Sequence, residues 1–220
     1  MKDFSQEILK FELDKNFKDD DFYISKSNKH IVDILNNWPK WEKNFINISG
    51  ENFSGKSHII NIFLKKFNGI KFEANSLTND DLRIIKIHQN IVLENLSLDI
   101  NEKLIYSLFN IIDQENKYLI VTSAKPIINI EFKLDDLKSR SKNFLLMEIK
   151  KPDDELIFAL LVKNLSDRQI SIEKKLIDYI IKRIDRSYSK IFNFIYKIDE
   201  ISLKKKKSID LKIIKEVLGE

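Results

Sequence analysis

The residues of this chain best suited to chemistry form a glycine-rich loop after a short apolar run. Gly50, Gly55, Lys56 and Ser57 fit G-x-x-x-x-G-K-[ST], the pattern of a phosphate-binding P-loop. Glycines let backbone N–H groups turn toward an anion, and the start of a following helix adds positive potential. Lys56 can reach the β- and γ-phosphates of a nucleotide, and the Ser57 hydroxyl can ligate Mg²⁺. The loop therefore predicts a site for ADP or ATP with Mg²⁺.

A second candidate for this site follows the apolar run NIVL, residues 90–93. In P-loop enzymes an acidic residue at such a strand end holds Mg²⁺, directly or through water, and a neighbouring carboxylate often polarises the attacking water. Glu94 occupies the first position, and Asn95, which cannot act as a base, occupies the second. We expect a site that binds nucleotide but hydrolyses it slowly by itself. A strand-end Glu94 without a ligand role is the alternative.

These residues need a sheet and helices to bring them together, and the apolar periodicity predicts both. Short apolar runs, rich in β-branched residues, predict strands at residues 45–48, 70–72, 90–93, 118–121 and 144–149. Apolar residues at helical spacing predict helices between them, from Ser57 onward and over residues 77–87 and 101–112. Strands that alternate with helices indicate βαβ crossovers. The fold class expected is therefore α/β, with a parallel sheet between helix layers.

The pattern changes near residue 150. From Pro152 onward only helices are expected, with caps at Asp153, Ser171, Ser187 and Ser208, and an earlier helix is expected after a cap at Ser27. We therefore divide the chain into an N-terminal segment (1–20), a nucleotide-binding core (21–150) and a helical region (151–220).

Composition excludes several classes of protein. The chain has 220 residues with 43% hydrophobic and 33% charged side chains, as in ordinary globular proteins. It has no cysteine, which excludes disulfides, thiolate catalysis and zinc–thiolate sites. No apolar run approaches the roughly 20 residues of a membrane span, and the N-terminus is too acidic for a signal peptide, so a cytoplasmic protein is expected. The net charge of +4 is too small to indicate nucleic-acid binding by itself, and His30, His58 and His88 lack metal-ligand spacing.

The N-terminal segment contains one short motif, QEILKF, with Gln6, Ile8, Leu9 and Phe11. It could be the end of an amphipathic helix that packs on the domain, which composition alone favours. It could instead be an exposed peptide whose apolar residues enter a pocket of a partner protein.

The order of these motifs resembles the DnaA family of AAA+ proteins, and more narrowly its Hda branch, the regulatory inactivators of DnaA. The resemblance runs from Gln6 to Leu218 and rests on the P-loop and on NIVLEN, YLIVTSAKP, DDLKSRSKN, MEIKKPDDE and KRIDRSYSKIFNFI. It implies an AAA+ core with a three-layer parallel sheet, followed by a small all-α lid. The chain ends at Glu220, after the lid, without the helix-turn-helix domain that reads DNA in DnaA, which favours the Hda branch. QEILKF is similar to the Q-x-x-L-x-F peptide that binds the bacterial sliding clamp, so the resemblance favours the partner-binding interpretation.

The resemblance also implies roles for single residues. The P-loop residues match the family's Walker A motif, Glu94 its Walker B acid, and Tyr23 with Ile24 a segment that lies near the adenine. Arg140 matches the arginine finger, which points into the nucleotide of a neighbouring subunit; its planar fork suits phosphoryl oxygens. The sensor 1 position falls at Ala124 or its neighbours Thr122 and Ser123. The sensor 2 position falls at Ser189, with Lys190 and Arg186 nearby.

The function implied is negative regulation of chromosomal replication initiation. Bound to ADP and held on the DNA-loaded clamp, the chain would stimulate hydrolysis of DnaA-bound ATP through Arg140, with weak ATPase activity of its own. The alternatives are a DnaA-like ATPase or DNA-associated adaptor that recruits replication proteins, and a scaffold that binds nucleotide only for stability. The implied partners are DnaA and the sliding clamp, the β subunit of DNA polymerase III. DNA contact is expected to be mainly indirect. The lysines at 204–207 could form a solvated turn or could contact the DNA backbone. A homodimer is left open.

Overall fold

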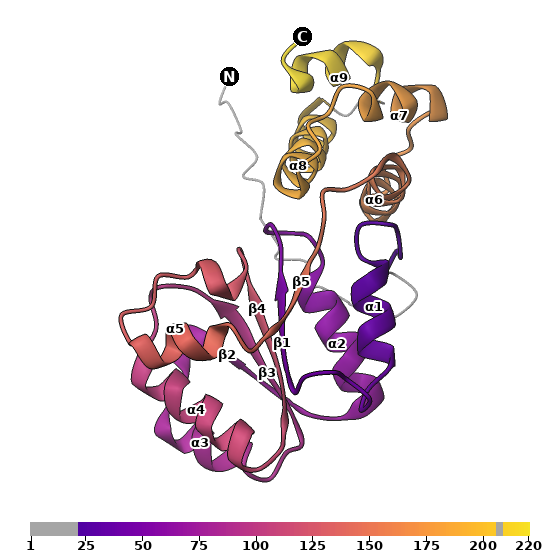
Figure 1. Ribbon diagram of the computed structural model, residues 1–220. Coiled ribbons are helices and arrows are strands. Elements are labelled where there is room, and N and C mark those ends of the chain that lie inside the picture. Colours follow the sequence, from indigo (N-terminus) through magenta and orange to yellow (C-terminus); the bar gives the residue numbers. More distant parts are fainter. Residues whose placement is uncertain (1–21, 206–208) are drawn as a thin grey trace.

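A parallel five-stranded sheet forms the centre of the core in the computed structural model, which describes residues 22–205 and 209–220 (Figure 1). The strands are β1 (Phe45–Ser49), β2 (Ile70–Glu73), β3 (Asn90–Leu96), β4 (Tyr118–Ser123) and β5 (Leu145–Glu148). Their spatial order is β2-β3-β4-β1-β5, and every neighbouring pair is parallel. The strand that precedes the P-loop therefore lies inside the sheet, between β4 and β5.

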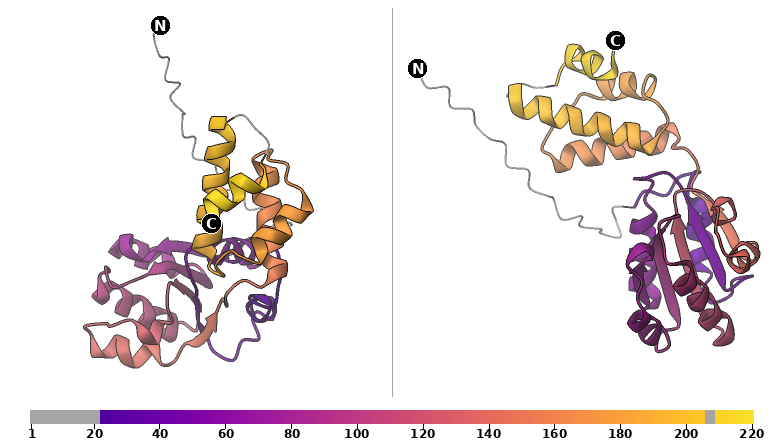
Figure 2. Two further views of the ribbon diagram at one scale, coloured as in Figure 1. Left: turned by 90° about the horizontal axis from the view of Figure 1, so that it is seen from above. Right: turned by 90° about the vertical axis from the view of Figure 1, so that its left-hand side faces the viewer.

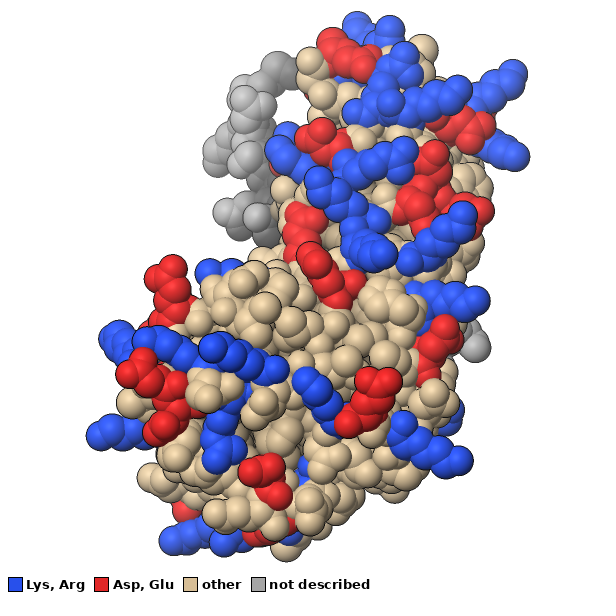
Figure 3. Space-filling view, in the orientation of Figure 1, with Lys and Arg blue, Asp and Glu red and all other residues tan. Residues whose placement is uncertain are grey.

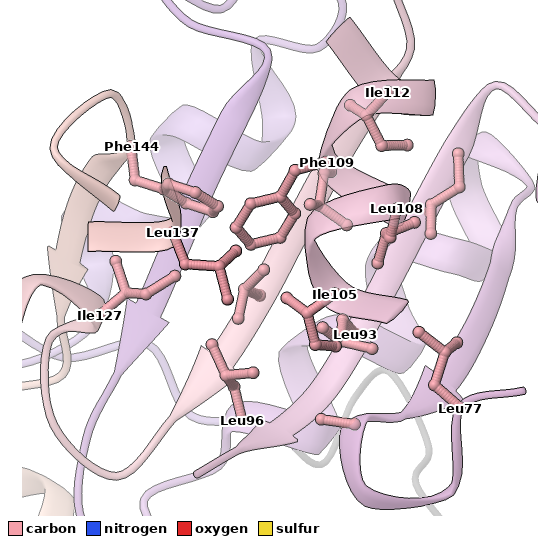
Figure 4. Packing of buried hydrophobic residues seen from close by; sticks show 14 of the residues in the cluster. Leu77, Leu93, Leu96, Ile105, Leu108, Phe109, Ile112, Ile127, Leu137 and Phe144 are labelled. Carbon is pink, nitrogen blue, oxygen red and sulfur yellow. The ribbon is translucent and has the colours of Figure 1, made fainter. Parts of the chain in front are cut away.

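Helices cover both faces of this sheet. The core helices are α1 (Lys29–Asn36), α2 (Lys56–Phe67), α3 (Asn79–Ile85), α4 (Glu102–Gln114) and α5 (Asp135–Ser141), with short 3-10 turns η2 (Ala74–Ser76) and η3 (Ile127–Asn129). On one face, Ile46 and Ile48 of β1 are buried together with Ile60 of α2. On the other, Leu93 and Val121 are buried with the apolar side of α4 around Phe109 (Figure 4). Because side chains of a strand alternate between faces, strands buried on both sides need near-continuous apolar runs, as found here.

The last third of the chain forms a separate helical layer, the lid. It contains α6 (Asp154–Asp167), α7 (Lys174–Ile181), α8 (Tyr188–Lys205) and α9 (Leu211–Leu218). These helices bury a hydrophobic cluster of their own, which includes Ile157, Leu161, Ile195 and Ile214. The lid stands above the end of the sheet where the P-loop lies (Figures 1 and 2). The prediction of an α/β core with a parallel sheet, followed by an all-α lid, is confirmed.

Several predicted boundaries were wrong. Strand β3 does not end before Glu94 but continues to Leu96, with an irregular register between Leu93 and Leu96. Helix α7 begins at Lys174, so Ser171 lies too far ahead to cap it. Helix α9 is capped by Asp210, whose side chain accepts from Ile213 N at 2.9 Å, whereas Ser208 lies outside the described residues. Helix α1 begins one residue later than expected, with Asn28 as its N-cap in place of Ser27. The predicted cap at Asp153 is confirmed by its hydrogen bond from Leu156 N at 2.8 Å.

Within the described part of the chain, no helix combines the length and the apolar composition that a membrane span requires.

Candidate functional site

The P-loop connects the end of β1 to the start of α2, and both of its glycines are sterically required. A Cβ on Gly50 would lie 2.9 Å from Ser54 Oγ and 3.1 Å from Ile149 Cβ. Gly55 has φ of +92° and immediately precedes α2, where a side chain would be strained and would meet the Phe22 ring at 3.3 Å. The first N–H groups of a helix have no acceptor one turn earlier in the helix, which makes the start of α2 suited to bind an anion. The loop is therefore shaped to bring backbone close to a phosphate.

Lys56 folds back over this loop. Its side chain is buried, and Nζ donates to the carbonyl oxygens of Gly50 at 2.6 Å and Glu51 at 3.0 Å. Burial lowers the pKa of Lys56, while the charge of Glu51 opposes that shift. A phosphate in the loop would give the ammonium group oxygens of opposite charge, which make stronger hydrogen bonds than neutral carbonyls.

The segment ahead of α1 lies beside the P-loop. Tyr23 and Ile24 are about half exposed, at 46% and 52%. The Phe22 ring packs edge-on against His58 of α2, with centroids 5.2 Å apart, and a Cβ on Gly55 would lie 3.3 Å from this ring. The sequence had placed Tyr23 and Ile24 at the site and missed Phe22, although all three belong to the same apolar patch.

Glu94 is buried near the end of β3, with 3% of its surface exposed. Lys71 of the neighbouring strand β2 pairs with Glu94 Oε2 at 3.2 Å, whereas Oε1 is buried and has no hydrogen-bond partner among the described residues. Asn95 turns the other way, with φ of +59°, and its Nδ2 donates to Glu73 Oε2 at 2.9 Å. Glu94 is therefore the one carboxylate that this strand supplies, and its side chain is buried.

These groups fit a hydrated Mg²⁺ better than a site built from protein ligands alone. The described residues contain no group of three or more acidic or histidine side chains able to hold a metal ion. The unpartnered Oε1 of Glu94 is an acceptor without a donor, which a metal-bound water would satisfy. Mg²⁺ in proteins keeps several waters and takes one or two side-chain ligands together with substrate phosphates.

The polar residues at the end of β4 are tied to the sheet. Thr122 Oγ1 accepts from Asn95 N at 3.0 Å. Ser123 Oγ donates to Lys125 O at 2.7 Å and lies 2.9 Å from Asn47 Nδ2. Ala124, at the expected sensor 1 position, is exposed. The buried Asn47 also accepts from Ile127 N at 2.8 Å, so it links β1, β4 and η3 beneath the P-loop.

The start of α8 meets the P-loop, which places the expected sensor 2 position close to it. Ser189 N donates to Glu51 Oε1 at 3.4 Å. Of the two cations considered there, Arg186 pairs with Asp154 of α6 at 2.6 Å, and Lys190 is exposed. Glu51, which carries this contact, was missed from the sequence because it occupies a variable position of the P-loop pattern.

Arg140 lies near the end of α5, on the side of the core opposite to the P-loop. It shares a surface hollow with Asn44 and Phe45, at the start of β1, and with Asp113, at the end of α4. Nη2 donates to Asn110 Oδ1 at 2.5 Å, Nη1 lies 3.7 Å from Asp113 Oδ2, and the guanidinium faces the Tyr106 ring at 5.4 Å. Its side chain is 29% exposed.

The length of β1 separates Arg140 from the P-loop. The strand has five residues and spans about 13 Å at about 3.3 Å per residue. Arg140 is beside its first residue, whereas the P-loop follows its last. The structure thus brings together Gly50, Gly55, Lys56 and Ser57, and it leaves Arg140 too far away to reach a phosphate bound there. Gln6, Ile8, Leu9 and Phe11 lie outside the described residues.

Comparison with known proteins identifies relatives of this arrangement. Residues 153–218 match the family model described as "Hda, lid domain". The chain is similar to the chromosomal replication initiator protein DnaA of Buchnera aphidicola subsp. Cinara cedri, 22% identical, with 98% of this chain and 55% of that protein covered. It is also similar to DnaA of Thermoanaerobacter sp. (strain X514), 26% identical over 52% of this chain and 26% of that protein. The chain thus spans between about a quarter and about half of these relatives.

Solved structures share the fold. Domain III of the Thermotoga maritima replication initiation protein DnaA has a TM-score of 0.72 at 15% identity, with 95% of this chain and 98% of that chain covered. AMPPCP-bound DnaA from Aquifex aeolicus has a TM-score of 0.69 at 21% identity, with 94% and 71% covered.

Proposed function

Because the chain belongs to the DnaA-related AAA+ family, we propose that it holds a nucleotide at its P-loop and uses Arg140 to promote hydrolysis of ATP bound to DnaA. The observation that carries this proposal is the separation of the two groups across β1. The core, residues 21–150, then presents a phosphate site at one end and a guanidinium at the other. The lid, residues 151–220, would cover the phosphate site. This activity would make the protein a negative regulator of replication initiation in the cytoplasm.

The nucleotide site would use the groups gathered around the P-loop. Backbone N–H groups and Lys56 would hold the phosphates, and Tyr23 with Ile24 would flank the base. Ser57 and Glu94 Oε1 would hold Mg²⁺ and its water, and the ion would neutralise phosphate charge. Asn95 is no base and Ser189 carries no charge, so the chain itself would hydrolyse ATP slowly and retain ADP. The AMPPCP-bound DnaA relative supports a nucleotide in this fold.

The partner proposed for Arg140 is ATP-bound DnaA. To act there, the guanidinium would leave Asn110 and Asp113, a partly exposed contact worth less than about 1 kcal/mol. In related phosphoryl-transfer proteins an arginine finger contributes about 10³–10⁵-fold to the rate, so the exchange is favourable. The match of the lid to the Hda family supports an inactivator of DnaA over an initiator.

We further propose that the N-terminal segment binds the sliding clamp through Gln6, Ile8, Leu9 and Phe11, which would hold the protein near DNA without a DNA site of its own. On the face shown in Figure 3, basic and acidic side chains are interspersed over the lid. Such a mixed surface favours indirect contact with DNA over a continuous phosphate-binding groove.

The experiment that tests this function follows conversion of ATP to ADP on DnaA in the presence of the chain, the clamp and DNA. The wild-type chain should accelerate conversion, and Arg140→Ala should abolish most of the acceleration. Arg83→Ala, which removes an arginine that is 85% exposed on α3, is the matched control and should act as wild type. No acceleration by the wild-type chain would refute the proposal.

Two further samples test the clamp proposal and the ATPase activity of the chain separately. Gln6→Ala with Leu9→Ala should lose the acceleration that depends on the clamp, and full activity of this double variant would remove only the clamp proposal. The isolated chain should turn over ATP slowly and bind DNA weakly. Rapid turnover together with DNA affinity that falls steeply with salt would instead indicate a DnaA-like ATPase or adaptor.

A further inference from the structure

Glu51, a side chain of the P-loop, reaches the first turn of α8 in the lid. Ser187 Oγ donates to Oε1, Tyr188 N donates to Oε2 at 2.9 Å, and Ser189 N donates to Oε1 at 3.4 Å. The first N–H groups of a helix have no partner within the helix. Ser187, the cap predicted from the sequence, accepts from Lys190 N at 3.4 Å. Glu51 completes this cap by accepting from the first two N–H groups of α8, from a position more than 130 residues earlier in the chain.

Two aromatic side chains of α8, Phe192 and Tyr188, also pack against the core at the place where α8 meets the P-loop. Phe53 of the P-loop stacks on Phe192 of α8, with ring centroids 5.1 Å apart and planes at 24°. Tyr188 is buried among core residues such as Ile46 and Ile48, and its hydroxyl donates to Lys150 O at 3.1 Å. The start of α8 thus packs on the core on both sides of the Glu51 carboxylate.

The charge of Glu51 is also coupled to the phosphate-binding lysine. Burial raises the pKa of Glu51, but the hydrogen bonds from Ser187, Tyr188 and Ser189 together hold it below its ordinary value, so the group is an anion at neutral pH. That negative charge raises the pKa of Lys56 against the effect of burial. One carboxylate therefore acts on both the P-loop lysine and the N-terminus of α8, where a helix favours an anion.

Among the described residues, the two cations beside Ser189 make no equivalent link. Ser189 is uncharged, Arg186 is paired with Asp154 of α6, and Lys190 is exposed. The helix end that faces the P-loop already holds an anion from the chain itself, so it does not need a phosphate to be satisfied.

We propose that Glu51 is the positioning residue of the lid: its carboxylate seats α8 on the P-loop whether or not a nucleotide is bound. The proposal rests on the proposed nucleotide site only in the part of the experiment that adds a nucleotide. Under this proposal Glu51 makes the contact between the P-loop and the lid that a lid cation bound to phosphate would otherwise make. The lid of the wild-type chain then keeps one position without nucleotide, with ADP and with a non-hydrolysable ATP analogue.

The test measures the distance between the core and the lid. The chain has no cysteine, so single cysteines at exposed Lys103 of α4 and Asp178 of α7 can carry two spin labels. Double electron–electron resonance should give one narrow distribution for the wild-type background, unchanged by either nucleotide. Glu51→Ala should lose that narrow peak. Glu51→Gln, which keeps an acceptor oxygen without the charge, should broaden it partly, and Glu51→Asp should restore most of it.

Two controls keep the interpretation specific. Asn52→Ala changes the next, exposed residue of the same loop and should leave the distribution as in wild type. Ser187→Ala removes one donor on the lid side and should broaden the peak less than Glu51→Ala. A Glu51→Ala distribution identical to wild type, or a wild-type peak that moves when ADP is added, would overturn the proposal.

Binding of a fluorescent ADP to the same samples distinguishes the two claims. If the wild-type chain binds no nucleotide but Glu51→Ala still loses the narrow peak, the nucleotide proposal fails and the positioning role of Glu51 stands. If ADP binds and Glu51→Ala keeps the narrow peak, the nucleotide proposal stands and the positioning role of Glu51 fails.

Discussion

The two ends of the sheet differ in how each holds its main cation. Lys56 is buried, donates to two backbone carbonyls and lies under a lid that Glu51 ties to the same loop. Arg140, beside the start of β1, is partly exposed and rests on Asn110 and Asp113 of one helix. The first arrangement suits a group that must hold a ligand in a fixed place. The second suits a group that can leave its resting contacts and act on another protein.

The largest effect on nucleotide affinity is expected at the buried end. Lys56→Ala should weaken ADP binding by about 10- to 150-fold, because a hydrogen bond to a charged group is worth about 1.5–3 kcal/mol. Titration with a fluorescent ADP measures it. Lys66→Ala, an exposed lysine on the same helix, is the control and should bind as wild type. Equal affinity of the Lys56→Ala and Lys66→Ala variants would show that the P-loop is not the nucleotide site.

The polar layer under the P-loop should matter next. Asn47→Ala leaves Ile127 N without its side-chain acceptor in a buried place, so the free energy of unfolding should fall by about 1–3 kcal/mol. At the other end, Asn110→Ala should cost less than about 1 kcal/mol, since its partner Arg140 is partly exposed. Urea unfolding followed by tryptophan fluorescence compares the two, and the reverse order would break the contrast between the ends.

A smaller effect should appear as the pH falls. The pKa of Glu51 lies below its ordinary value of 4.5 in the folded chain, so its cap on α8 stabilises the fold above that value and is lost as pH falls through the folded pKa. A helix cap is worth about 0.5–2 kcal/mol. Stability curves of wild type and Glu51→Gln should therefore differ at pH 7 and converge below about 4.5. Curves that stay parallel would show that the Glu51 charge does not stabilise the fold.

The smallest effect is expected when Arg140 loses its hydrogen bond to Asn110. Asn110→Ala removes a resting contact of Arg140, and DnaA-bound ATP should be hydrolysed up to about fivefold faster at a limiting concentration of the chain. A slower rate than wild type would indicate that Asn110 orients Arg140 for its task.

The contrast also explains what the sequence could predict. The P-loop follows from a local pattern of eight residues, and the α/β class follows from strands alternating with helices. The position of Arg140 came from a family resemblance, because its helix α5 has seven residues and carries little periodicity. The strand order was not predictable, so the Lys71–Glu94 pair could not be foreseen. The contact of Glu51 with α8 joins distant residues. Glu51 occupies a variable position of the P-loop pattern, and a predicted cap at Ser187 does not show which residue Ser187 contacts.

The most direct test of the account measures both ends in one variant. Arg140→Ala should bind ADP with the affinity of wild type and lose nearly all stimulation of ATP hydrolysis on DnaA, a loss of about 10³–10⁵-fold if Arg140 acts as an arginine finger. Stimulation equal to wild type would contradict the account, as would a parallel loss of ADP binding.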